Sequence, residues 1–271
     1  TENDMPYATA AAGAEIFYER HGAGTPILMS AGMGGSGAFW SPQIARLSER
    51  HTVIVYDQVG TARSRAGDDG VRTIAGMADD MVCVMDDVGV EAAHVVGHAI
   101  GGIVGLELAM SRPQRLRSVT VVNGWGRADA FLRRCFEVRR EILNQSGPRA
   151  YVRAQPLFLF PPQWISENTA KLDADEAQIL AHIPPAETIN KRIEMFLAFD
   201  PGARLAGITT PTLITTATDD ALVPAYLTRQ LAAAIPGAQL REVAYGAHAF
   251  TAVTPGIFNT MLLDFIATIG G

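Results

Sequence analysis

Short, continuous apolar runs alternate along the chain with longer stretches in which apolar residues recur at helical spacing. The runs are rich in β-branched residues and predict buried strands at residues 14–19, 26–30, 52–56, 93–97, 118–122, 212–217 and 239–244. The helical spacing predicts helices at residues 39–47, 73–88, 100–111, 225–235 and 255–269. Strands that alternate with helices indicate an α/β fold, and their continuous apolar character predicts a mostly parallel sheet covered on both faces.

This alternation stops between residues 127 and 206, where the pattern is helical and contains no clear strand. An arginine-rich helix is expected at residues 128–145, and a proline-bounded stretch at 156–162 separates it from two further helical stretches. We therefore expect an α/β core made of residues 1–126 and 207–271. Residues 127–206, the helical insertion, are expected to fold as a lid over that core.

Composition narrows the class of partner. The chain has 271 residues, of which 48% are hydrophobic, and its 22 basic and 28 acidic residues give a net charge of −6. An acidic chain without a basic run argues against binding to nucleic acid or to an anionic membrane surface. The longest apolar runs fall short of the roughly 18 residues expected of a membrane span. A small-molecule substrate is therefore the expected partner, with the protein as a monomer or a homodimer.

Cys83 and Cys135 are far apart and have no Cys or His neighbours at metal-ligand spacing. We expect reduced thiols, no metal and no cofactor. The polar, acidic stretch at residues 1–4 is unlike a secretory signal, so the expected location is cytoplasmic.

The sequence from Gly97 to Gly101 follows a predicted strand and opens a predicted helix. Gly-x-Ser-x-Gly in this context forms the nucleophile elbow, a strained strand-to-helix turn that presents a serine oxygen above a sheet. Here residue 99 is alanine, which leaves the nucleophile slot without an attacking atom. We expect the neighbouring His98 to be a packing residue rather than a catalyst.

The acid and the base of such a site follow later strands, in the chain order nucleophile, acid, base. Asp220 lies where the acid is expected, although its neighbour Asp219 could be mistaken for it. An aspartate here could instead be a turn residue that caps the helix near Pro224, but that explains only one of the two acids. His248 is the only histidine in the C-terminal third of the chain and is the expected base.

Backbone N–H groups at two places could stabilise a developing negative charge. One belongs to Ile100, the residue after the nucleophile slot, and the other to Met33 in a glycine-rich loop that follows an early strand. Gly32 in that loop would allow close approach of a ligand to the backbone. The glycines lack the spacing of a phosphate-binding or dinucleotide-binding loop, so nucleotide binding is not expected.

The helical insertion should supply specificity. Trp125, Phe158 and Trp164 are candidates for pocket walls, although aromatic residues of this kind are more often core residues. One of Arg133, Arg134 and Arg139 could hold a substrate carboxylate; the sequence does not separate them, and Arg134 is the one we assign.

With these residues placed, the chain resembles the α/β-hydrolase superfamily along its whole length, which implies an eight-stranded sheet. Within it the chain is most similar to the hydrolases of the Rut pathway of pyrimidine breakdown. The resemblance lies in residues 57–61, 97–99, 122–125, 134–139, 154–159, 222–224 and 245–249, and weakens around residues 183–189. It implies alanine as the natural residue at the elbow and 3-aminoacrylate or carbamate as the substrate.

Three hypotheses follow for a hydrolase scaffold with an alanine at the elbow. The first is hydrolysis of a small, already labile C–N compound by water that His248 and Asp220 activate, with the N–H groups of Met33 and Ile100 holding the oxyanion. The second is a covalent serine hydrolase of small esters or amides whose serine at position 99 has been replaced. The third is a non-catalytic binding protein, against which the acid–base pair counts.

Overall fold

A computed structural model describes residues 6–68, 70 and 72–269; the polar stretch at residues 1–4 therefore lies outside the described residues. Eight strands form one sheet in the order β1-β2-β4-β3-β5-β6-β7-β8. The strands β1 and β2 pair in antiparallel fashion, as do β2 and β4, and all later pairs are parallel. The strands are Tyr7–Thr9 (β1), Glu15–His21 (β2), Thr25–Ser30 (β3), His51–Tyr56 (β4), Ala93–His98 (β5), Leu116–Val122 (β6), Thr212–Ala217 (β7) and Gln239–Val243 (β8).

Helices cover both faces of the sheet. The helices of the core are Ser41–Leu47 (α1), Ile74–Asp87 (α2), Ile100–Ser111 (α3), Ala225–Ala234 (α9), Phe250–Val253 (α10) and Pro255–Ala267 (α11). Short 3-10 turns are Ala11–Gly13 (η1), Gly37–Trp40 (η2), Pro113–Arg115 (η3), Gly202–Gly207 (η5) and Ala247–Ala249 (η6). The predicted α/β core of residues 1–126 and 207–271 thus contains every strand of the sheet.

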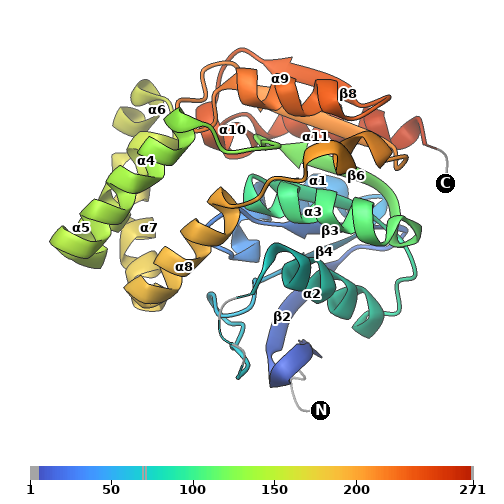
Figure 1. Cartoon of the computed structure of the whole chain (residues 1–271), viewed down its shortest axis with the longest axis horizontal. Helices are drawn as coiled ribbons and strands as arrows, with labels where there is room; N and C mark the ends of the chain where they lie inside the picture. Colours follow the sequence, from blue (N-terminus) through green and yellow to red (C-terminus); the bar gives the residue numbers. More distant parts are fainter. Residues whose placement is uncertain (1–5, 69, 71, 270–271) are drawn as a thin grey trace.

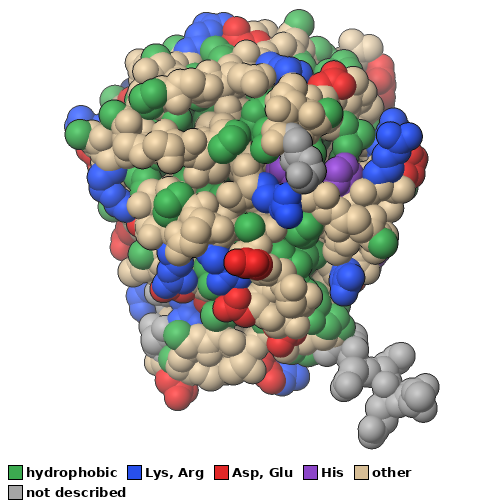
Figure 2. Space-filling view, turned by 90° about the vertical axis from the view of Figure 1, so that its right-hand side faces the viewer, with side chains coloured by type: hydrophobic (Ala, Val, Ile, Leu, Met, Phe, Trp, Pro, Cys, Tyr) green, Lys and Arg blue, Asp and Glu red, His purple; other side chains and the backbone are tan. Residues whose placement is uncertain are grey.

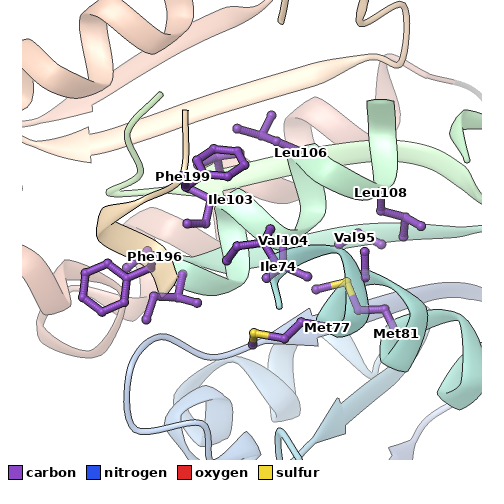
Figure 3. Packing of buried hydrophobic residues seen from close by; sticks show 14 of the residues in the cluster. Ile74, Met77, Met81, Val95, Ile103, Val104, Leu106, Leu108, Phe196 and Phe199 are labelled. Atoms are coloured by element: carbon purple, nitrogen blue, oxygen red, sulfur yellow. The ribbon is translucent and has the colours of Figure 1, made fainter. Parts of the chain in front are cut away.

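Alternate residues of one strand enter different cores, which explains the continuous apolar strands. Ile27 and Met29 of β3 join a cluster with α1 and α11, whereas Leu28 between them joins a cluster with α2 and α3. In Figure 3, Met77 and Met81 of α2 lie beneath Val104 of α3, within this second cluster. Burying both faces requires an apolar residue at every strand position.

The helical insertion lies between β6 and β7 and adds no strand to the sheet in the described chain. It consists of Ala130–Glu141 (α4), a π-helical turn at Ile142–Ser146 (η4), Gly147–Leu159 (α5), Pro162–Glu167 (α6), Thr169–His182 (α7) and Ala186–Leu197 (α8). In Figure 1 these helices gather on one side of the molecule, at the left of the view, while the two termini lie away from them. Phe196 near the end of α8 is fully buried and anchors the insertion in the α2–α3 core (Figure 3).

The parallel register places the residues of interest at one edge of the sheet. Ser30 is paired with Gly97, His98 with Val122, and Val122 with Thr215, so β3, β5, β6 and β7 end together. The loops that follow their carboxyl ends therefore meet, as ligand sites do in open parallel sheets. These loops contain the residues that the sequence assigns to a site.

No single helix of the described chain is long and apolar enough to cross a membrane. The segments Ala247–Val253 and Pro255–Ala267 together reach the length and composition, but the chain bends by 86° between them. On the face of the molecule shown in Figure 2, acidic and basic side chains are interspersed rather than gathered by sign.

Candidate active site

The strand-to-helix turn at residue 99 is strained although it presents no nucleophile. Ala99 has φ 48° and ψ −107°, a region that L-residues rarely adopt. The turn is tight enough to need glycine on either side. A Cβ on Gly97 would lie 2.2 Å from the carbonyl of Gly101, and a Cβ on Gly101 would lie 2.4 Å from the Ser30 carbonyl oxygen. The backbone therefore has the geometry of a nucleophile elbow, with a methyl group in place of a hydroxyl.

Two N–H groups border this turn. Ile100 is the first residue of α3, so its N–H is among those that a helix leaves without an intrahelical acceptor. Met33 lies in the loop after β3, whose Ser30 and Ala31 carbonyl oxygens pack against the start of α3 at Gly101. Neither N–H donates a hydrogen bond to an acceptor in the described part of the chain. That these two N–H groups bind an oxygen atom near Ala99 stays a prediction.

The structure pairs Asp220 with His248. Asp220 follows β7, and its Oδ2 accepts a hydrogen bond of 2.8 Å from Nδ1 of His248 in η6, after β8. Its other oxygen accepts the N–H groups of Leu222 and Val223 at 2.8 and 2.9 Å. A carboxylate held in this way fixes the proton of His248 on Nδ1, which leaves Nε2 free to accept a proton.

Asp219 has a different partner from Asp220. Its Oδ2 accepts the N–H of Gly246 at 3.0 Å and its Oδ1 accepts that of Ala247 at 2.8 Å. Gly246 has φ 128°, and a Cβ there would lie 2.5 Å from Cβ of Phe250, so the loop turns sharply just before His248. Asp219 thus holds the loop on which the histidine lies, while Asp220 bonds to the ring.

Asn123 is a further residue of this group that the sequence analysis did not identify. Its Nδ2 donates to the carbonyl oxygens of Ala247 and His248, at 3.2 and 2.7 Å. Asn123 itself has φ 51°, and its backbone N–H donates to Thr215. The sequence did contain a signal for Asn123, because it directly follows a buried β-branched strand. Asn tolerates the left-handed backbone that a sharp turn at such a position requires. We call Asn123, Asp219, Asp220 and His248 the acid–base corner.

His98 acts as packing, as expected from the sequence. Its Nε2 donates to the His248 carbonyl oxygen at 2.8 Å, and its ring lies edge-on to that of His248 at 4.6 Å between centroids. Complete burial holds the pKa of His98 well below its usual value of 6.5, so the ring stays neutral. Gly32 is needed beside it, because a Cβ at that position would lie 2.8 Å from Nδ1 of His98.

The three aromatic candidates lie in different surroundings. Trp125 is buried in the core against Phe196, with ring centroids 5.7 Å apart. Phe158 of α5 is partly buried and lies near the guanidinium of Arg139, whereas Trp164 stacks on Phe160 at 4.3 Å. Phe158 thus lies beside a buried charged side chain, that of Arg139.

The three candidate arginines of α4 also differ in their exposure to solvent. Arg133 and Arg134 are exposed, and Arg133 donates to the Leu197 carbonyl oxygen at 2.8 Å. Arg139 is the buried one of the three, so Arg134, the arginine assigned from the sequence, does not share its burial. A fourth arginine, Arg192 of α8, is also buried and was not identified from the sequence. The signal was a charge within an apolar stripe, because Ile189, Ile193 and Phe196 lie on the same face of the helix.

The site is closed in this structure. Ala99, Asp220 and His248 are 5%, 4% and 3% exposed. A surface hollow of about 620 Å³ lies between α2, α3 and α8, but no residue of the acid–base corner lines it. Among the described residues no group of three or more His, Cys, Asp or Glu side chains is arranged to hold a metal ion.

Comparison with known proteins places this geometry in a family. The family model for the α/β-hydrolase fold matches residues 25–251. A protein of Azorhizobium caulinodans named "Putative carbamate hydrolase RutD" is 61% identical over 265 residues, which cover 98% of this chain and 99% of that protein. A protein of the same name from Caulobacter vibrioides is 49% identical over 93% of this chain and 95% of its own length. The chain belongs to the RutD family of α/β-hydrolases.

Solved structures share the fold. An enol-lactonase from Burkholderia xenovorans is 25% identical and superimposes with a TM-score of 0.86 over 97% of this chain and all of that chain. An esterase from Thermogutta terrifontis, 21% identical, gives a TM-score of 0.85 over 98% of this chain and 99% of its own. The RutD family chain is thus a hydrolase of this fold, as the sequence predicted.

Proposed function

We propose that the protein hydrolyses a small, already labile C–N compound of pyrimidine breakdown, 3-aminoacrylate or carbamate, by activating water without a serine nucleophile. The observation that carries the proposal is the pairing of Asp220 with His248 beside an elbow that holds alanine. The names of the RutD relatives and the resemblance of the insertion to Rut-pathway hydrolases support the choice of substrate.

His248 takes the role of general base. Nε2 removes a proton from a water molecule at Ala99, and Asp220 stabilises the imidazolium that forms. The N–H groups of Met33 and Ile100 bind the oxygen on which negative charge develops. The helix N-terminus at Ile100 adds a favourable dipole for that charge.

The overall chemistry balances with water as the only co-substrate. In 3-aminoacrylate the water oxygen adds to carbon 3 after His248 takes one water proton, the second water proton passes from the added hydroxyl to carbon 2, and the bond from carbon 3 to nitrogen breaks. The products are ammonia and the three-carbon aldehyde acid. In carbamate, the water oxygen adds to the carboxyl carbon, and the C–N bond breaks to give ammonia and bicarbonate. His248 returns the abstracted proton to the departing nitrogen in either case.

The magnitude of the expected catalysis restricts the substrate. Serine-protease triads that lose one member keep roughly 10³–10⁴-fold acceleration over water. At 1.36 kcal/mol for each factor of ten, this corresponds to about 4–5.5 kcal/mol of barrier. This is too little for an unactivated amide, but it is enough for an enamine or carbamate that already decomposes unaided. The alanine at position 99 therefore supports a labile substrate.

The test is a comparison of decay rates. Time courses of 3-aminoacrylate and carbamate decay are measured with the native protein, with His248→Ala, and with His182→Ala as the exposed control. We expect His248→Ala to lose roughly 10²–10⁴-fold of the acceleration, as removal of a general base does, and His182→Ala to lose none. If His248→Ala accelerates decay as well as the native protein, the water-activation mechanism is wrong.

A second arm addresses the covalent alternative. Ala99→Ser restores an oxygen at a turn whose backbone already has elbow geometry. Chromogenic esters are then offered to both proteins. A burst of product from Ala99→Ser, with none from the native protein, is the result expected of a scaffold that has exchanged serine chemistry for water chemistry. Equal ester turnover by both proteins would mean that a serine at the elbow adds nothing, which would contradict an exchange of serine chemistry for water chemistry.

A further inference from the structure

The helical insertion holds two buried arginines close to the candidate site. Arg139 of α4 is 3% exposed and Arg192 of α8 is 4% exposed. Arginine is almost never fully buried in proteins unless its charge is paired. The burial of these two arginines therefore has to be explained, whereas an exposed arginine on the surface needs no explanation.

No carboxylate of the described residues lies within ion-pair distance of either guanidinium. Arg72 provides the contrast within the same molecule, because it is also buried but its Nε lies 3.2 Å from Oδ2 of Asp80. Tyrosines are the titratable neighbours of Arg192, namely Tyr56 and Tyr151. Burial lowers the pKa of Arg192 to about 10, so the side chain is still a cation at neutral pH.

Both guanidiniums also keep unused donors. Nη2 of Arg192 donates to Oε1 of Gln58 at 2.5 Å and to the Met33 carbonyl oxygen at 3.3 Å. Nη2 of Arg139 donates to Oε1 of Gln155. The Nε atom of each is buried without a hydrogen-bond partner in the described chain. A buried, unpaired cation with a free N–H is costly, and an anionic ligand would remove that cost.

The position of Arg192 ties it to the reacting centre. It contacts Met33, whose N–H is one of the two proposed oxyanion donors, directly through the backbone carbonyl. Through Gln58, whose Nε2 donates to the Ala31 carbonyl oxygen at 2.7 Å, it also holds the start of the same loop. The guanidinium therefore contacts the loop after β3 both directly, at Met33, and through Gln58.

Arg139 belongs to another helix of the insertion, α4. Its guanidinium carbon lies 4.6 Å from the ring centroid of Phe136, 5.7 Å from that of Tyr151 and 5.4 Å from that of Phe158. Helix α5, which carries Tyr151 and Phe158, packs against the turn that contains His248. Tyr151 is also an electrostatic neighbour of Arg192, so one tyrosine neighbours both cations.

We propose that Arg192 binds the carboxylate of the substrate, with Arg139 supplying further positive potential, and that the site therefore selects a small monocarboxylate whose carboxylate is separate from the reacting carbon. The proposal rests on the proposed hydrolysis and deepens it. In 3-aminoacrylate the carboxylate is two bonds from carbon 3, so one group can bind Arg192 while the other faces His248. In carbamate the carboxyl carbon is itself the reacting centre, so a carboxyl oxygen would bind the N–H groups of Met33 and Ile100 rather than Arg192.

Binding is tested first, apart from catalysis, with acrylate as the probe and acrylamide as its neutral isostere. Calorimetric titrations compare the native protein, His248→Ala, Arg192→Gln, Arg192→Lys and Arg134→Gln, the last being an exposed arginine of the insertion. We expect Arg192→Gln to weaken acrylate binding by roughly 10- to 100-fold, the loss typical of a charged hydrogen bond. Arg134→Gln and His248→Ala should bind acrylate like the native protein, and acrylamide should bind weakly to all.

Several outcomes would overturn the assignment. Equal binding of acrylate and acrylamide by the native protein would contradict it without any variant. Unchanged acrylate binding by a folded Arg192→Gln protein would contradict it as well. If Arg192→Gln does not fold, Arg192→Lys keeps the charge but loses the planar fork, and native-like affinity together with native-like selectivity for the anion over acrylamide would exclude guanidinium recognition.

A kinetic arm separates this inference from the proposed function. For 3-aminoacrylate, Arg192→Gln should raise KM more than it lowers kcat, whereas carbamate decay should change little. If the native protein accelerates neither decay but binds acrylate through Arg192, the proposed hydrolysis fails and the carboxylate site stands. If His248 is required but Arg192 is not, the hydrolysis stands and the carboxylate site fails.

Discussion

The acid–base corner and the buried arginines of the helical insertion are polar groups of opposite design. In the corner, Asp219 and Asp220 each accept hydrogen bonds on both oxygens. In the insertion, the hydrogen bonds of Arg139 and Arg192 within the described chain go to neutral oxygens, Arg139 lies beside aromatic rings, and each arginine keeps a buried N–H without a described partner. The two carboxylates of the corner are thus held on both oxygens within the fold, as catalysis by already oriented groups requires. The insertion is incomplete in a way that a ligand would complete.

Replacing Asp220 by Asn is expected to have the largest effect on this comparison. The amide can no longer hold the His248 proton on Nδ1 as a carboxylate does, so Nε2 loses its role as base. We expect decay of the labile substrate to slow by roughly 10²–10³-fold, with acrylate binding unchanged. Steady-state kinetics and calorimetry on the same preparation check this. A parallel loss of acrylate affinity would mean that the corner and the arginines are not independent.

Replacing Asp219 by Asn should affect stability more than chemistry. Its two hydrogen bonds hold the backbone N–H groups of the loop before His248, and the side chain is exposed to solvent. We expect a loss of about 1 kcal/mol in the free energy of unfolding and less than about a tenfold change in rate. Urea denaturation and the decay assay measure the two effects. Asp220→Asn is the matched comparison, since the same chemical change one residue later should reverse the order of the effects.

Acid should weaken the sheet rather than the insertion. Burial lowers the pKa of His94 in β5 from its usual 6.5 to about 4, with Arg117 and His51 contributing. Between these pH values the unfolded chain binds a proton that the folded chain does not, so stability falls as pH decreases from about 6.5 toward 4. We expect this residue to account for about 1 kcal/mol of the stability lost between pH 7 and 5.

Urea midpoints at the two pH values, for the native protein and His94→Asn, measure the contribution of His94. The variant should lose less stability on acidification, because Asn does not titrate. His182→Ala, at an exposed site, should keep the native dependence. An identical acid dependence for His94→Asn and the native protein would assign the loss to other groups.

The sequence predicted the core of this fold more completely than its site. β-branched runs identified seven of the eight strands, and β1 escaped because three residues carry no recognisable pattern. The glycines at 97 and 101 identified the elbow because close backbone approach admits no other residue there. Asp220 and His248 were found from chain order, since the fold places those loops at one edge.

What the sequence could not predict depends on partners that are distant in the chain. Asp219 and Asp220 are indistinguishable by composition, and only the approach of the loop at 246–248 separates their roles. Arg192 is buried and has no described carboxylate partner, whereas Arg134 is exposed. Burial and the lack of a partner both depend on residues that are distant in the chain, so the sequence around each arginine does not reveal them. The resemblance to known hydrolases was weakest around residues 183–189, which include the start of α8, and Arg192 lies further along that helix.

The near-complete burial of Ala99 and His248 bears on the rate of turnover as well as on the chemistry. A three-carbon ion cannot reach a ring that is 3% exposed unless parts of the insertion first move. Such opening of a cover over a site takes microseconds to milliseconds and often limits turnover. The hydrogen bond between Arg192 and the Met33 carbonyl oxygen joins the insertion to the core, so we expect it to be among the contacts that opening must break. We therefore expect the overall rate to depend on the opening of the insertion as well as on the reaction at His248.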